Sequence, residues 1–155
     1  MRRDERAVSD ILQIQDILQR CDTVRIGMNG GEFPYVVPMT FGSAVEDGKI
    51  VVYIHSAGEG RQCDILAKDP RVCVEADLYY KVAKKENGEI TAVYESVIGT
   101  GIAERLTAQA DKVAALKIML AHYKESGFPV TSCHGLGRVE CFRIVLDEVS
   151  GKRNL

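Results

Sequence analysis

One short stretch of the sequence combines residue types that suit the binding of a phosphate group. It reads YIHSAGEGRQCDIL and spans residues 53–66. An apolar, strand-like run ends in His55 and Ser56, two glycines follow, and Arg61 stands where the chain turns helical. The N–H groups at a helix start favour anions, and a guanidinium can hold a phosphate through two parallel hydrogen bonds. The same residues would also suit a plain turn with a solvated arginine, so this stretch alone leaves both interpretations open.

A second stretch, SCHGLGRVEC, contains residue types that ligate metals. Cys133 and His134 are adjacent, and Cys141 follows seven positions after the histidine. A zinc site needs ligands that converge, whereas adjacent residues on an extended chain point to opposite faces, so we predict no metal site here. A glycine-rich loop near the mouth of a binding site remains possible. His134 and His55 are therefore the two candidate catalytic residues, although a lone histidine more often has a structural role.

Composition sets the outer limits of these hypotheses. The chain has 155 residues, 46% of them hydrophobic and 27% charged, with a net charge of −2. These are ordinary values for a globular protein, and we expect one domain over residues 1–155. The weak net charge gives no general attraction to nucleic acid or membranes, and no segment approaches the ~18 apolar residues of a membrane-spanning helix.

The cysteines and the start of the chain bear on location. Five cysteines, an odd number without a CxxC pair, fit reduced thiols better than a disulfide framework. The first ten residues, MRRDERAVSD, contain acidic residues and no apolar core, unlike a signal peptide. We therefore expect a cytoplasmic protein.

Three helices and six strands are expected to position the candidate residues. Apolar residues three or four apart predict a helix over residues 9–21, a short helix before Pro70, and a third from Thr107 that ends by Gly127. Apolar or alternating runs predict strands over residues 23–29, 35–42, 50–56, 71–80, 92–106 and 137–152.

The connections between these strands indicate an antiparallel sheet. Asn29-Gly30, Asp47-Gly48 and Asn87-Gly88 are hairpin signals, and six such strands favour closure into a barrel. Pro38 cannot donate a ladder hydrogen bond, which predicts an edge strand or a bulge at that position. The alternation of a parallel sheet is missing, and so is the full GxGxxG spacing, which argues against a Rossmann fold.

Five segments in order resemble one family over nearly the whole chain. They are PYVVPMTFG, YIHSAGEGR, DPRVCVEAD, ESVIGTGIAE and VSGKR. The sequence resembles the pyridoxamine 5′-phosphate oxidase-like split-barrel superfamily, and within it the flavin-nucleotide-binding branch related to 5-nitroimidazole resistance proteins. The resemblance implies a mainly β fold with flanking helices, a six-stranded antiparallel split β-barrel. It also implies a homodimer that binds FMN at the subunit interface.

The resemblance also assigns cofactor contacts to particular residues. It implies that Arg61 holds the phosphate, and that Gln62, where the family commonly has lysine, still donates a hydrogen bond but adds no charge. The remaining contacts that it implies come from Pro38, Met39 and Thr40 beside the ring, from His55, Ser56 and Ala57 beside the ribityl chain, from the segment Glu95, Ser96 and Val97, and from the basic ending with Lys152 and Arg153.

Each of these residues has an ordinary structural alternative. Pro38 and Met39 would suit an edge strand and a core, Ser56 and Ser96 a turn or a surface, and the basic ending a solvated tail.

The family resemblance leaves more than one function open. The first is an FMN-dependent oxidoreductase that acts on a small acceptor such as a nitro-aromatic compound, where the flavin performs the redox chemistry. The others are a non-enzymatic FMN carrier or sensor, a haem protein and a deazaflavin-binding protein. Colour separates them, because a flavin spectrum and the Soret band of haem differ.

Overall fold

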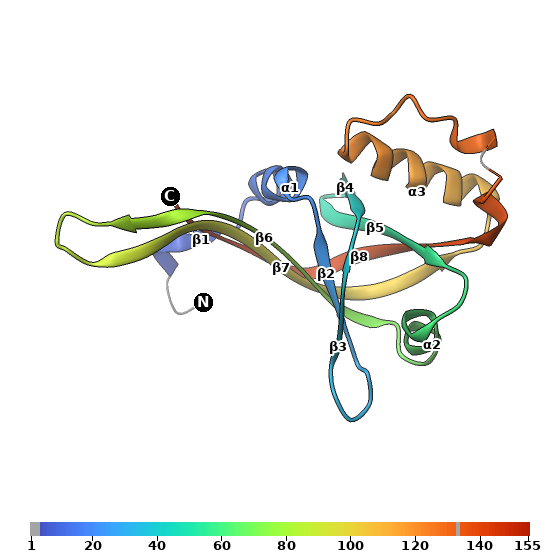
Figure 1. The fold of residues 1–155 in the computed structure, drawn as a ribbon, viewed down its shortest axis with the longest axis horizontal. Helices are drawn as coiled ribbons and strands as arrows, with labels where there is room; N and C mark the ends of the chain where they lie inside the picture. Colours follow the sequence, from blue (N-terminus) through green and yellow to red (C-terminus); the bar gives the residue numbers. More distant parts are fainter. Residues whose placement is uncertain (1–3, 133) are drawn as a thin grey trace.

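The computed structural model describes residues 4–132 and 134–155, and it is built on one antiparallel sheet (Figure 1). The described part of the sheet has eight strands. They are β1 (Ala7–Val8), β2 (Val24–Met28), β3 (Tyr35–Met39), β4 (Phe41–Glu46), β5 (Lys49–Ala57), β6 (Arg71–Lys84), β7 (Ile90–Leu106) and β8 (Val139–Asn154).

Three α-helices and three short 3-10 helices accompany the sheet in the described residues. The α-helices are α1 (Ile11–Arg20), α2 (Arg61–Lys68) and α3 (Gln109–His122), and the 3-10 helices span Asp4–Arg6, Val130–Ser132 and Leu136–Arg138. Asp10 caps α1 by accepting a hydrogen bond from the Gln13 N–H, which confirms one of the two predicted caps. The third helix ends earlier than predicted, at His122, and Lys124 follows with a positive φ of 62°.

The split of the barrel follows from the order of the strands. Along the sheet the order is β3-β2-β6-β7-β8-β5-β4, so β3 and β4 form its two edges. Thr40 alone separates these edge strands in the chain, which forces the sheet to curl until its edges lie close together. The strand β3 pairs with one neighbour, β2, where Pro38 lies opposite Arg25. This confirms the predicted edge strand.

One predicted strand is in fact two, and this changes the strand count. The run 35–42 was expected to be continuous, but the chain passes from one edge of the sheet to the other at Thr40. With the two-residue strand β1, which pairs with the end of β8, the described sheet has eight strands instead of the predicted six. The mainly β split-barrel architecture with flanking helices is as predicted.

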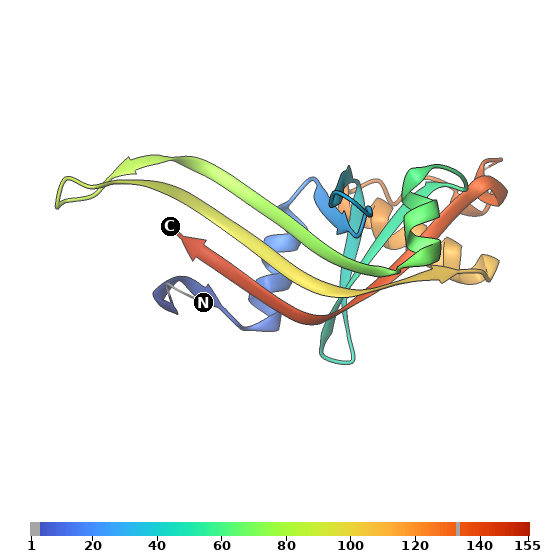
Figure 2. The ribbon, with the colours of Figure 1, turned by 90° about the horizontal axis from the view of Figure 1, so that it is seen from below.

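The strands β6, β7 and β8 are long and lie side by side (Figure 2). The β6–β7 hairpin extends well beyond the rest of the molecule as an arm (Figure 1). The register shifts between Thr100 and Gly101 against β8, at the glycine pair where a bend was expected. A Cβ at Gly101 would lie 2.1 Å from the Val145 carbonyl oxygen, so this position requires glycine.

Two apolar cores lie on opposite faces of the curled sheet. The larger fills the barrel and includes the buried face of α1 with Ile14, Ile17 and Leu18. The smaller lies between α3 and the other face of β5, where Val51 and Tyr53 meet Met119. Successive residues of β5 therefore point into different cores, as alternation in a strand requires.

The closest approach between α3 and the sheet occurs at Gly42 in β4. A Cβ built there would lie 2.7 Å from the Met119 backbone nitrogen, which leaves no room for a side chain. We expect Gly42→Ala to lower the free energy of unfolding by about 1–3 kcal/mol, because α3 must shift away. Urea denaturation measures this loss. Gly27→Ala is the control, since its Cβ would find its nearest neighbours at 3.6 Å; equal losses for both variants would contradict the packing argument.

Candidate functional site

The first turn of α2 joins the ends of two strands that are distant in the chain. The Gln62 side-chain amide donates to the Met39 sulfur at 3.1 Å, which links α2 to the end of β3. The Cys63 sulfur lies 3.5 Å from the Ser56 hydroxyl oxygen, which links the same turn to the end of β5. The structure thus brings Met39, Ser56 and Gln62 to the helix turn that begins at Arg61. Their contact with a cofactor, which the family resemblance implies, stays a prediction.

Arg61 is exposed and stacks on an aromatic ring. Its guanidinium carbon lies 4.7 Å from the centroid of the Tyr35 ring. In the described part of the chain no carboxylate forms an ion pair with Arg61, and no side chain caps the start of α2. A free guanidinium at an uncapped helix start is a suitable environment for an anion.

A groove of about 440 Å³ runs beside Arg61 between α2 and the turn after β2. The turn contributes Asn29, Gly30 and Gly31, and α2 contributes Asp64, Ile65 and Lys68. Arg61 lies on the wall of this groove, so a bound anion can reach it from solvent.

The other predicted residues near this turn differ in orientation. Pro38, Thr40 and Ala57 are exposed. His55 pairs with Cys141 in the sheet and lies on the face of β5 that carries Val51 and Tyr53, opposite to Ser56. A cofactor beside Ser56 would therefore lie on the other face of β5 from the His55 side chain. The predicted contact of His55 with the cofactor stays a prediction.

Burial determines the protonation state of His55. Desolvation lowers the pKa of its imidazole below the usual value, so the ring is neutral at pH 7. The Nδ1 atom is buried and has no hydrogen-bond partner in the structure as described. An unpartnered ring nitrogen leaves a hydrogen bond available, but on the face of β5 opposite to Ser56 and its contact with the α2 turn.

The second candidate histidine and the metal question involve the loop after α3. His134 is exposed, and Cys133 lies outside the described residues. Cys21, Cys63, Cys73 and Cys141 are free thiols. Within residues 4–132 and 134–155, no three His, Cys, Asp or Glu side chains gather as metal ligands would.

The remaining predicted site residues lie on β7 and β8, where Ser96 pairs with Lys152. Along β7 they are distant from the level of His55, because His55 pairs with Cys141 and Cys141 pairs with Leu106. Across the sheet the path is shorter. Pro38 pairs with Arg25, Arg25 with Glu75, and Glu75 with Ile98, so β3 lies three strand spacings, about 14 Å, from this part of β7.

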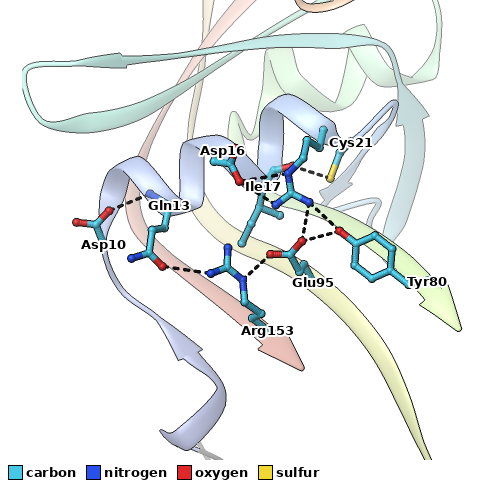
Figure 3. A network of polar contacts seen from close by, with 9 residues as sticks. Asp10, Gln13, Asp16, Ile17, Cys21, Tyr80, Glu95 and Arg153 are labelled. Carbon is cyan, nitrogen blue, oxygen red and sulfur yellow. Dashed lines mark hydrogen bonds and ion pairs between the residues drawn. The ribbon is translucent and has the colours of Figure 1, made fainter. Parts of the chain in front are cut away.

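Glu95 is a buried carboxylate at the centre of an ionic network at the base of the arm (Figure 3). Its side chain is only 2% exposed. One carboxylate oxygen accepts from Arg20 of α1 at 2.6 Å and from the Tyr80 hydroxyl at 2.6 Å. The other oxygen accepts from Arg153 at 2.5 Å. These contacts tie α1 to β6, β7 and β8.

This network explains which arm residues can meet a ligand. Glu95 is occupied by its partners and Val97 is buried in the barrel core, so neither side chain is free to contact a cofactor. The side chains of Ser96 and Lys152 lie on the opposite face of the sheet, where they are free to contact a cofactor. Arg153 is an integral ion-pair partner, so its interpretation as a solvated tail is wrong.

Several contributors to these sites were missed from the sequence. Arg20 and Tyr80 are 75 and 15 residues from Glu95, so no local pattern connects them. Tyr35 opens the strand run that was identified, and its alternation with Val37 and Met39 was the available signal for a shared face.

The family comparison agrees with the fold. Residues 10–153 match the family model described as pyridoxamine 5′-phosphate oxidase. The chain belongs to this family, whose fold is the split barrel described above. A comparison with curated proteins finds no match.

Solved structures support the same assignment. A proposed 5-nitroimidazole antibiotic resistance protein from Bacteroides thetaiotaomicron VPI-5482 is 27% identical, with a TM-score of 0.81 over 94% of this chain and 85% of that one. The flavocytochrome Anf3 from Azotobacter vinelandii is 19% identical, with a TM-score of 0.80 over 100% of this chain and 72% of that one. The FAD and haem binding protein from Mycobacterium smegmatis is 17% identical, with a TM-score of 0.80 over 96% and 73%. The last two show the fold alone.

The described helices also bear on membrane association. None of them is both long enough and apolar enough to span a bilayer.

The Glu95 network leads to a stability prediction. Glu95→Gln removes the charge but keeps the shape, which leaves two arginines without their shared carboxylate. We expect the free energy of unfolding to fall by about 2–4 kcal/mol. Urea denaturation of both proteins measures the difference. Asp147→Asn is the control, because its pair with Lys49 is exposed and should contribute below about 1 kcal/mol.

The same network makes stability depend on pH. Arg20 is the main reason that the pKa of Glu95 falls from its usual 4.5 to about 2. Because the folded state holds the lower pKa, this contribution is complete above pH 4.5 and is lost as pH falls toward 2. The wild type should therefore lose up to about 3 kcal/mol more than Glu95→Gln over this range. Parallel losses in both proteins would refute the assignment to Glu95.

Proposed function

We propose that this protein binds FMN and acts as a flavin-dependent oxidoreductase on a small acceptor such as a nitro-aromatic compound. Arg61 carries the proposal, because it is a free guanidinium at an uncapped helix start, beside the ends of β3 and β5. Membership of the pyridoxamine 5′-phosphate oxidase family supports a flavin. The similarity to a proposed 5-nitroimidazole resistance protein supports the class of acceptor.

The residues around α2 fit the phosphate end of a flavin nucleotide. Arg61 would bind the dianion through its N–H edge, with the free backbone N–H groups of the α2 start adding weaker donors. The Ser56 hydroxyl stands next to the same turn and can donate when its weak contact with Cys63 is exchanged. Gln62 is directed at Met39, which is consistent with a phosphate site that relies on one cation instead of two.

The flavin, once bound, supplies the redox chemistry, and the chain supplies binding and orientation. Arg61 and the α2 turn would fix the phosphate, and the end of β3 at Met39 would border the rest of the cofactor. The neutral His55 has an unpartnered Nδ1, but its side chain lies on the face of β5 opposite to Ser56, so it would serve as a proton carrier only for a ligand that reaches that face.

We also propose that two chains are needed to complete the site. Ser96 pairs with Lys152 and lies beside Ile98, about three strand spacings across the sheet from Pro38 in β3. The face of β7 that carries Ser96 also exposes Ile98 and Ile102, which are 50% and 48% exposed. A homodimer that buries this face would place a second chain beside Ser96.

The proposed phosphate contact is tested by comparing FMN with riboflavin. We expect the wild type to bind FMN more tightly, because only FMN carries the group that Arg61 would hold. Arg61→Ala should weaken FMN binding by about 2–3 kcal/mol and leave riboflavin binding nearly unchanged. Quenching of flavin fluorescence measures both affinities, and the FMN loss should shrink at high salt.

Lys117→Ala is the matched control, since it removes an exposed cation from α3, on the opposite side of the sheet. It should change neither affinity. Equal affinities of the wild type for FMN and riboflavin would refute the phosphate assignment. The spectrum of the purified protein tests the alternatives, because a Soret band without flavin absorption would indicate haem.

The dimer is tested by light scattering at micromolar concentration. The wild type should have twice the chain mass of 17.1 kDa, whereas Ile98→Glu should shift toward the monomer, because a charge would enter the proposed interface. Leu12→Glu is the control, since Leu12 is 71% exposed on α1 and lies outside the proposed interface. A wild-type monomer with FMN bound would overturn the proposal of a shared site.

A further inference from the structure

Tyr35 is the residue against which Arg61 is held. Tyr35, Val37 and Met39 alternate along β3, and all three pack against the barrel core while the residues between them are exposed. Two of these three meet the first turn of α2, Tyr35 through Arg61 and Met39 through Gln62. The edge strand and the helix start therefore touch at two consecutive residues of the helix.

The stacking leaves the binding edge of the arginine free. A guanidinium is planar, and its N–H groups lie in that plane. The guanidinium carbon lies over the Tyr35 ring, 4.7 Å from its centroid, so the N–H groups that point away from the ring remain available to an anion. Asp64 and Asp69 line the same groove as Arg61, but among the described residues the Asp69 carboxylate pairs with Arg71 instead.

An unrestrained arginine would lose side-chain freedom on binding an anion. An arginine that already rests against Tyr35 has lost part of this freedom before binding, so the entropy cost of ordering its side chain on binding is smaller. The Gln62 contact with Met39 fixes the helix start relative to β3 and so preserves the distance between Arg61 and Tyr35.

We propose that Tyr35 is a positioning residue that gives the site its preference for a phosphorylated flavin by holding Arg61 ready to bind the phosphate. Tyr35 acts through Arg61 and makes no contact with the phosphate itself. This inference rests on the proposed function, because it assumes that Arg61 binds the phosphate.

The test is the ratio of FMN affinity to riboflavin affinity in Tyr35 variants. Tyr35→Leu removes the π face, and we expect the ratio to fall about two- to five-fold, the size of an exposed cation–π contact. Tyr35→Phe keeps the ring and should keep the ratio. A merely structural role would lower both affinities together and leave the ratio unchanged. Tyr35→Met provides a second variant without a ring, with the same expected fall, in case Tyr35→Leu does not fold.

A double-variant cycle links the effect to Arg61. In the Arg61→Ala background, Tyr35→Leu should leave the ratio unchanged, because the group that Tyr35 positions is gone. A ratio that is unaffected by Tyr35→Leu, or that falls equally in both backgrounds, overturns the inference while the phosphate assignment stands. A ratio that is unaffected by Arg61→Ala overturns the phosphate assignment, and the inference with it.

Discussion

The short link at Thr40 is the constraint on which the rest of the structure depends. One residue joins β3 to β4, yet these strands lie at opposite ends of the seven-strand path through the sheet. A flat sheet would place its edges several strand widths apart, at about 4.8 Å for each strand, so the sheet has to curl. The curl encloses the barrel core and leaves an unpaired seam where Met39 meets the first turn of α2. The candidate site lies at this seam because the backbone there is not covered by a neighbouring strand.

Glu95 and Arg61 show how differently the chain treats two charged groups. Glu95 is buried and accepts three hydrogen bonds, one each from Arg20, Tyr80 and Arg153, so its role is to hold α1 on the long strands. Removing a partner from such a group is costly because the remaining charge stays buried. Arg61 is exposed, stacked and without an acidic partner among the described residues. Its charge contributes little to stability, which makes it the better candidate for a role in binding.

The sequence predicted the features that depend on neighbouring residues. The α1 cap at Asp10, the end of α2 before Pro70 and the edge position of Pro38 all follow from local chemistry. The division of 35–42 into two strands was not predictable, because Thr40 has no turn signature and the break depends on where the two edges of the sheet meet. The Glu95 network was missed for a similar reason, since its arginines come from residues 75 and 58 positions away. Alternation in the sequence predicted that His55 shares one face of its strand with Val51 and Tyr53. Only the structure shows that this is the face that packs against α3.

The long strands connect the stable part of the molecule to the proposed shared site. In β7, the side of the strand that holds Glu95 and Val97 is fixed by the barrel core and the ionic network. Because successive side chains of a strand point to opposite faces, Ser96 and Ile98 must lie on the other face of β7. The network therefore contributes to more than stability, because α1 covers only the face of β7 that carries Glu95, and Ile98 on the other face stays exposed. That exposed face is the one on which the proposed second chain would pack.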